Sequence, residues 1–214
     1  MNYTEAKLQE NYTTFIEFLK KVFTGERLEK LLHMYSQDEL GVNVLISPAS
    51  SFKHFHNAYD GGYLDHIMGV AKNSIRIMNL YKEAGGIIDF TQEELLFAAI
   101  HHDLGKLGEP GKIHYLPNES EWHIKNQGRI YVSNPDLPYM AIADRTFWLL
   151  SHYGITHTHN EWFGISLADG MYDDDNAKYL KTFSQEKQLR SNLGHLLHWA
   201  DVLTTNVERD AVIK

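Results

Sequence analysis

The stretch AAIHHDLGK, residues 98–106, guides the interpretation of the whole chain. Residues 95–100 are all apolar, and two histidines and an aspartate follow them directly at 101–103. Thr91 and Glu94 have the spacing of a capping box, so the pattern predicts a helix over about 92–103. A buried aspartate without a partner is costly, and the end of a helix favours positive charge. A cation bound at this helix end would satisfy both conditions.

The rest of the chain is also patterned as helices. Apolar residues recur at three- and four-residue steps, the period of an amphipathic helix, in five further segments. These predict helices over about 8–23, 28–35, 63–84, 139–153 and 186–208, and a second capping box predicts a short helix over 158–168. Residues 36–62 are expected to form a long ordered loop or a short-strand region, and 106–138 a long excursion over the surface. Strand signals are scarce, so the sequence predicts an all-α fold with long connecting loops.

Two residues outside the central stretch are candidate ligands for the same cation. His66 lies in the first turn of the 63–84 helix, and Asp201 lies on the apolar face of the last helix. The alternatives are ordinary: a histidine on an apolar face is usually hydrogen-bonded within the core, and Asp201 could pair with a lysine or an arginine.

Composition restricts the class of protein. A chain of 214 residues, 43% hydrophobic and 22% charged, is expected to form a single soluble domain over 1–214. The N-terminus lacks a secretory signal, so a cytoplasmic protein is expected. No cysteine is present, so any metal site must use imidazole and carboxylate groups, and the chain carries 13 histidines and 28 acidic residues.

The net charge of -8 disfavours long nucleic acids as partners, because their binding depends on many Lys and Arg contacts to phosphates. A small phosphorylated molecule fits better. A local basic pocket could still hold a few phosphates on an acidic protein.

Several motifs together resemble the HD-domain metal-dependent phosphohydrolases, and the similarity covers most of the chain. PAS at 48–50 with HNAYDGGYLDH at 56–66 is similar to the segment leading into the first metal histidine of that family. AAIHHDLGK resembles its central motif, and HWADVLTT at 198–205 its closing motif. The layout is closest to short HD proteins of tailed bacteriophages, which share stretches similar to 144–155 and 169–176.

The resemblance implies a helical HD bundle on which helices within 1–35 pack. It implies one divalent ion, Mn, Co, Zn, Fe, Ni or Mg, held by four ligands: His66, His102, Asp103 and Asp201. It also implies hydrolysis of a phosphate ester of a nucleoside mono- or triphosphate, in the host cytoplasm if the chain is phage-encoded. A homo-oligomer remains open.

The same resemblance suggests roles for other residues. Asp103 and Lys106 are the expected catalytic groups, with Asp103 orienting or deprotonating the attacking water. Lys106, Arg145 and His56 are the expected substrate contacts. Alternatives are a 3'-5' exonuclease on short oligonucleotides, a non-catalytic nucleotide-binding module, and a di-iron oxygenase.

One departure from the family favours a single metal. By the resemblance, Ile142 and Ala168 stand where two-metal relatives carry histidines, so a second ion would have to recruit His123 or His152. A metal bound by the histidines of HYGITHTH, 152–159, or by the acidic run 173–175 is a weaker expectation. The four tryptophans are expected in the core.

Overall fold

The fold is mostly α-helical, as the sequence predicts. The computed structural model describes residues 3–181, 184–189 and 191–213. In that part of the chain the α-helices are α1 (Glu5–Val22), α2 (Gly25–Met34), α3 (Gly41–Ile46), α4 (Gly62–Glu83), α5 (Gln92–His101), α6 (Glu121–Gln127), α7 (Ile142–His152), α8 (His159–Ser166), α9 (Ala177–Leu180) and α10 (Leu193–Ile213). The 3-10 helices are η1 (Leu104–Leu107), η2 (Gly170–Tyr172), η3 (Asp174–Asn176) and η4 (Gln185–Lys187), and the strands are β1 (Tyr115–Pro117) and β2 (Tyr131–Ser133).

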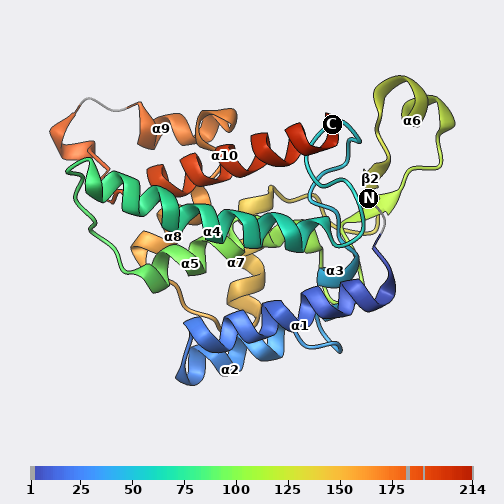
Figure 1. Ribbon diagram of the computed structural model, residues 1–214, viewed down its shortest axis with the longest axis horizontal. Helices are drawn as coiled ribbons and strands as arrows, with labels where there is room; N and C mark the ends of the chain where they lie inside the picture. The colour runs from blue at the N-terminus through green and yellow to red at the C-terminus, as the bar shows by residue number, and fades with distance from the viewer. Residues whose placement is uncertain (1–2, 182–183, 190, 214) are drawn as a thin grey trace.

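Helices α4 and α10 form the centre of the structure, and they run side by side across the molecule (Figure 1). Close approach is possible because Gly69 of α4 faces Thr204 of α10, where an added Cβ would lie 2.9 Å from the Thr204 Cγ2 atom. Helix α5 packs against α4, and every residue from Leu95 to His101 is buried. The contacts of α4 with α5 and with α10 therefore fix the positions of these three helices relative to one another.

The N-terminal helices α1 and α2 share the core with these central helices. Phe23 packs edge-on against Phe97 of α5, with ring centroids 6.0 Å apart. Arg27 of α2 forms two hydrogen bonds to the buried carboxylate of Glu161 on α8, at 2.6 and 2.9 Å. Bidentate pairs of this kind are among the strongest polar contacts in proteins. The N-terminal segment is thus bonded to the bundle, and it closes one side of it (Figure 1).

Both predicted capping boxes are present, at Thr91–Glu94 and Thr158–Glu161. Helix α10, however, begins at Leu193 and not near residue 186. The Asn192 backbone N–H donates to the Asp89 carboxylate at 3.0 Å, and its side-chain amide donates to the Ile87 carbonyl. These bonds tie the chain to the loop between α4 and α5, so the helix starts only after them.

The two predicted loop regions contain short elements that the sequence pattern missed. Residues 36–62 include α3. Residues 106–138 include α6 and the antiparallel pair β1–β2, with Leu116 opposite Val132. This part projects from the bundle at the edge opposite α9 (Figure 1).

The prediction that the tryptophans lie in the core is wrong for three of them. Trp122 on α6 is 60% exposed, and Trp148 and Trp199 are 40% and 46% exposed. In the described residues no helix has both the length and the apolar composition required to cross a membrane.

Candidate metal centre

His66 of α4 is buried and has one ring nitrogen occupied. Its Nδ1 lies 2.9 Å from Glu208 Oε2, across the contact between α4 and α10. A neutral imidazole that donates Nδ1–H to a carboxylate leaves its Nε2 lone pair available. This arrangement of carboxylate and histidine is typical of metal sites, where the carboxylate orients the ring.

His102 and Asp103 follow directly after α5. His102 Nδ1 lies 2.8 Å from the Ala99 carbonyl oxygen, which can only accept, so this nitrogen carries the hydrogen. The opposite nitrogen, Nε2, is buried without a hydrogen-bond partner. A buried polar atom with no partner is costly, and a cation would supply one.

The four predicted ligands converge from three segments. His66 Nε2 lies 3.2 Å from Asp201 Oδ1 and 3.6 Å from Asp103 Oδ2. His102 Nε2 lies 3.5 Å from Asp103 Oδ2 and 3.8 Å from Asp201 Oδ1. Two imidazole nitrogens and two carboxylate oxygens thus face a common space, and this donor set suits a divalent transition metal. The ligand atoms of His66, His102 and Asp103 all lie within 4.8 Å of one another.

The site holds an excess of negative charge next to one lysine. Lys106 Nζ donates to Asp103 Oδ2 at 2.6 Å. Burial raises the pKa of Asp103, but the positive charges of Lys106, His102 and His66 together hold this pKa below its usual range. Burial lowers the pKa of His66, but hydrogen bonds to Asp201 and Glu208 raise it to about 10. Without an ion, these carboxylates therefore attract a proton to His66, and a metal ion can take the place of that positive charge.

A cavity of about 230 Å³ adjoins these groups. Besides three of the ligands and Lys106, its lining includes His56, whose Nε2 is buried without a hydrogen-bond partner. The ring centroids of His56 and His66 are 4.6 Å apart. Burial, together with the charges of His66 and Lys106, lowers the pKa of His56 to about 3. His56 is therefore a neutral imidazole facing the cavity at physiological pH.

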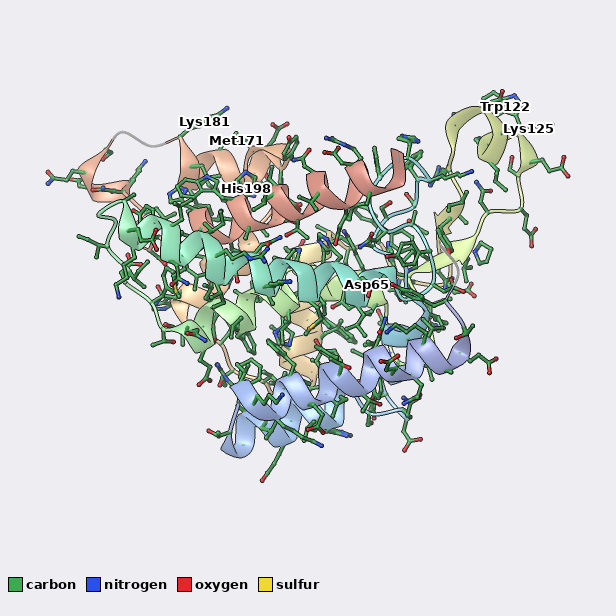
Figure 2. All side chains as sticks on the ribbon, in the orientation of Figure 1. Asp65, Trp122, Lys125, Met171, Lys181 and His198 are labelled. Atoms are coloured by element: carbon green, nitrogen blue, oxygen red, sulfur yellow. The ribbon has the colours of Figure 1, made fainter. Side chains whose placement is uncertain are left out.

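The sequence analysis did not identify four residues of this region: Glu208, Asp169, Tyr172 and Arg209. Glu208 follows Asp201 by seven residues, two turns along the same helix face, so spacing alone could have indicated it. Asp169, directly before η2, and Tyr172, the last residue of η2, also line the cavity. That turn is held against α10 by His198, whose Nδ1 lies 2.6 Å from the Ala168 carbonyl oxygen; Figure 2 labels His198 on α10. Burial and the nearby Asp103 raise the pKa of Asp169.

Arg145 is not among the residues that line this cavity. Its guanidinium is buried behind the 133–142 segment, where Nη2 donates to the Pro138 carbonyl at 2.5 Å. The sequence could not show this, because the position of Arg145 depends on how the long 106–138 excursion folds back. The expected role of Arg145 as a substrate contact therefore stays a prediction, and any such contact would lie outside the metal cavity.

The other histidines considered for metal binding lie elsewhere. His123 on α6 bonds to the Ser120 hydroxyl at 2.8 Å, and His152 stacks on Trp148. The His157 ring packs against Phe147.

A second group of possible ligands, His56, His66 and Glu208, shares His66 with the first group.

Comparison of the chain with protein-family models, with curated proteins and with solved structures found no match.

Proposed function

We propose that this chain is a metal-dependent phosphohydrolase of the HD type, which cleaves a phosphate ester of a nucleotide. One observation carries the proposal. Two buried histidines, one in α4 and one directly after α5, each have Nδ1 engaged as a donor, and each aims Nε2 at the carboxylates of Asp103 and Asp201. Such a set of neutral imidazoles and carboxylates is what a divalent cation requires.

The residues present fit Mn, Co, Zn, Fe, Ni or Mg, with His66, His102, Asp103 and Asp201 as ligands. A divalent ion in this position supplies Lewis acidity toward a phosphate oxygen and toward a water molecule. One ion is the simpler expectation, because Ile142 and Ala168 offer no donor side chain and His123 and His152 are not among the residues of the cavity.

The surrounding side chains support hydrolysis of a phosphate ester. The Asp103 carboxylate can orient the attacking water and accept its proton. The largely buried Lys106 ammonium lies beside it and can offset negative charge that develops on the phosphoryl oxygens. The neutral His56 imidazole can donate a hydrogen bond to the phosphoryl group or to the leaving oxygen. No covalent intermediate is needed.

The size of the cavity and the charge of the chain favour a nucleotide. A volume of about 230 Å³ is smaller than a typical ligand pocket, so it suits the phosphoryl end of a nucleotide with the base outside. Tyr172 lines the cavity and is 87% exposed, so its ring is available to stack on a base at the opening. Arg209 adds positive charge at the same place.

The test is a panel of nucleoside mono- and triphosphates, short oligonucleotides and cyclic dinucleotides, each incubated with Mn²⁺, Co²⁺, Zn²⁺ or Mg²⁺. We expect release of phosphate or pyrophosphate from a nucleotide with at least one metal. Glu208→Gln should weaken metal affinity by about 10- to 100-fold, because it loses the charge that orients His66. The matched control is Glu83→Gln, the same change at an exposed carboxylate at the end of α4.

Other outcomes would assign the site differently. Stepwise release of mononucleotides from the oligomer, faster than any nucleotide is cleaved, would indicate a 3'-5' exonuclease. Tight nucleotide binding without turnover under every metal would indicate a binding module. Two irons per chain with consumption of oxygen would indicate an oxygenase.

A further inference from the structure

A second cavity of about 470 Å³ lies beside the start of α7 and shares no lining residue with the metal cavity. Its walls come from the 133–142 segment, from α7 and from the chain just before β1. The polar side chains in its lining are those of His114, Tyr115, Ser133, Asn134, Tyr139 and Arg145.

Arg145 is buried in this wall without a counter-ion. Its side chain is among the largest that are fully buried, and the residue is only 1% exposed. Nη2 donates to the Pro138 carbonyl and Nη1 lies 3.4 Å from His114 Nδ1, whereas Nε has no hydrogen-bond partner. Across the described ranges, no carboxylate lies within ion-pair distance of the guanidinium. A buried cation left in this state is unfavourable, and an anion in the cavity would relieve it.

His114 lines the same cavity and has a ring N–H that can act as a donor. Arginine has no acceptor atoms, so the contact with Nη1 requires His114 Nδ1 to be the acceptor, which places the hydrogen of the neutral ring on Nε2. Burial and the charge of Arg145 lower the pKa of His114 to about 4, so the ring is neutral at physiological pH. It therefore adds an N–H donor and no competing charge.

The first turn of α7 adds backbone donors. The N-cap residue Ala141 provides no side-chain cap, and both Ala141 and Ile142 line the cavity. Uncapped N–H groups at the start of a helix attract anions. The nearby acidic groups are Asp144, which is exposed in the first turn, and Glu109, whose charge acts on Arg145.

This cavity is close to the metal centre. Lys106 lines the metal cavity, and its charge also lowers the pKa of His114, so the ammonium is within electrostatic range of both cavities. The α7 start is also fixed against η1, because the Gly105 N–H donates to Thr146 Oγ1 at 2.9 Å and a Cβ on Gly105 would lie 2.2 Å from the Ile142 carbonyl oxygen.

We infer that Arg145, His114 and the start of α7 form a second oxyanion site, which binds a phosphate group separate from the one placed at the metal centre. That the phosphate belongs to the substrate rests on the proposed function; the anion site itself does not. A substrate that fills both sites carries more than one phosphate, as a nucleoside triphosphate does.

The first test measures binding of inorganic phosphate by calorimetry to chelator-treated protein at neutral pH and low salt. We expect one site per chain that is weakened by at least about tenfold in Arg145→Gln, since a charge-assisted contact is lost. Arg76→Gln, an exposed arginine of α4, is the matched control and should bind like wild type. Arg145→Lys keeps the charge and should retain part of the affinity, and it serves if Arg145→Gln does not fold.

Absence of phosphate binding to the wild-type protein, or equal binding to both Arg145 variants and wild type, would overturn the inference. The second test compares the KM of a nucleoside triphosphate with that of its monophosphate. Loss of Arg145 should raise the KM of the triphosphate by about tenfold and leave the KM of the monophosphate within about twofold of the wild-type value. Equal effects on both substrates would show that Arg145 does not contact a second phosphate.

The two proposals can fail separately. Phosphate binding that depends on Arg145 in a chain that hydrolyses no nucleotide would retain the oxyanion site and remove the phosphohydrolase. Hydrolysis of a nucleotide, together with phosphate binding that is unchanged in Arg145→Gln, would retain the phosphohydrolase and remove the oxyanion site.

Discussion

The direction of single hydrogen bonds decides what the histidines of the centre can bind. His66 and His102 both use Nδ1 as a donor, to Glu208 and to the Ala99 carbonyl, and so both are held as the tautomer that ligates through Nε2. His101 has the same kind of bond, from Nδ1 to the Phe97 carbonyl, and its Nε2 is also without a hydrogen-bond partner, but its ring stacks against Tyr35 within the core and is not grouped with the carboxylates. Two adjacent histidines therefore have separate roles, one beside the carboxylates and one in the core.

The sequence could indicate which groups would lie together: the apolar helix that ends in His-Asp points to His102 and Asp103, and the resemblance of two further motifs adds His66 and Asp201. The sequence could not indicate the residues that orient these four side chains. Glu208 contacts His66 only because α4 and α10 cross at that level, and Arg145 turns away from the metal cavity because the 133–142 segment supplies it with the Pro138 carbonyl. Both depend on contacts between segments far apart in the sequence.

Asp103→Ala is expected to lose the metal and also to destabilise the fold. The substitution leaves the largely buried Lys106 ammonium, whose side chain is 16% exposed, without its partner, and this should cost up to about 3 kcal/mol, less than breaking a fully buried pair. Asp103→Ala with Lys106→Met should recover most of the stability but not the metal. Elemental analysis and urea unfolding measure the two effects. Wild-type metal content in Asp103→Ala would remove Asp103 from the ligand set.

At the scale of elements, helices with a long apolar period and a cap were predicted well. The expected 63–84 and 92–103 correspond to α4 and α5, since Gly85 and Gly86 follow the first and Thr91 caps the second. Elements of three to seven residues, such as α3, α6, β1 and β2, are too short to show a period. The start of α10 was misplaced because Leu189 continues the apolar spacing, although the bonds of Asn192 to Asp89 fix a different start.

The crossing of α4 and α10 sets the distance between His66 and Asp201, and Gly69 permits it. Gly69→Ala should destabilise the chain by about 1–3 kcal/mol, the usual cost of overpacking, and weaken metal binding. Gly69→Ala with Thr204→Ser should reverse much of both effects, because serine lacks the methyl group that the new Cβ meets but keeps the hydroxyl bond to the Ala200 carbonyl. Thermal unfolding and metal titration of the wild type, the two single variants and the double variant measure both effects. No recovery in the double variant would show that the crossing does not control the site.

For the molecule as a whole, the net charge of -8 bears on substrate length. We expect a nucleotide to be cleaved faster than a ten-nucleotide oligomer of the same base, because an acidic surface repels a polyanion and releases few counterions from it. Rates measured at two salt concentrations test the reason: rising salt should narrow the difference by relieving repulsion. Faster cleavage of the oligomer at low salt would contradict this prediction.

The positions of the ligands along the chain have a consequence beyond chemistry. Residues 66, 102–103 and 201 are far apart in sequence and meet only in the folded protein, so an ion bound to all of them acts as a reversible cross-link. Binding to the folded state alone adds about 2.7 kcal/mol of stability when free metal is 100 times Kd. The melting temperature should therefore rise with metal concentration in the wild type and much less in Asp201→Asn, whereas a constant value in the wild type would exclude the cross-link. In a cell, metal starvation would then shorten the lifetime of the chain itself, since the unfolded fraction is what proteases remove.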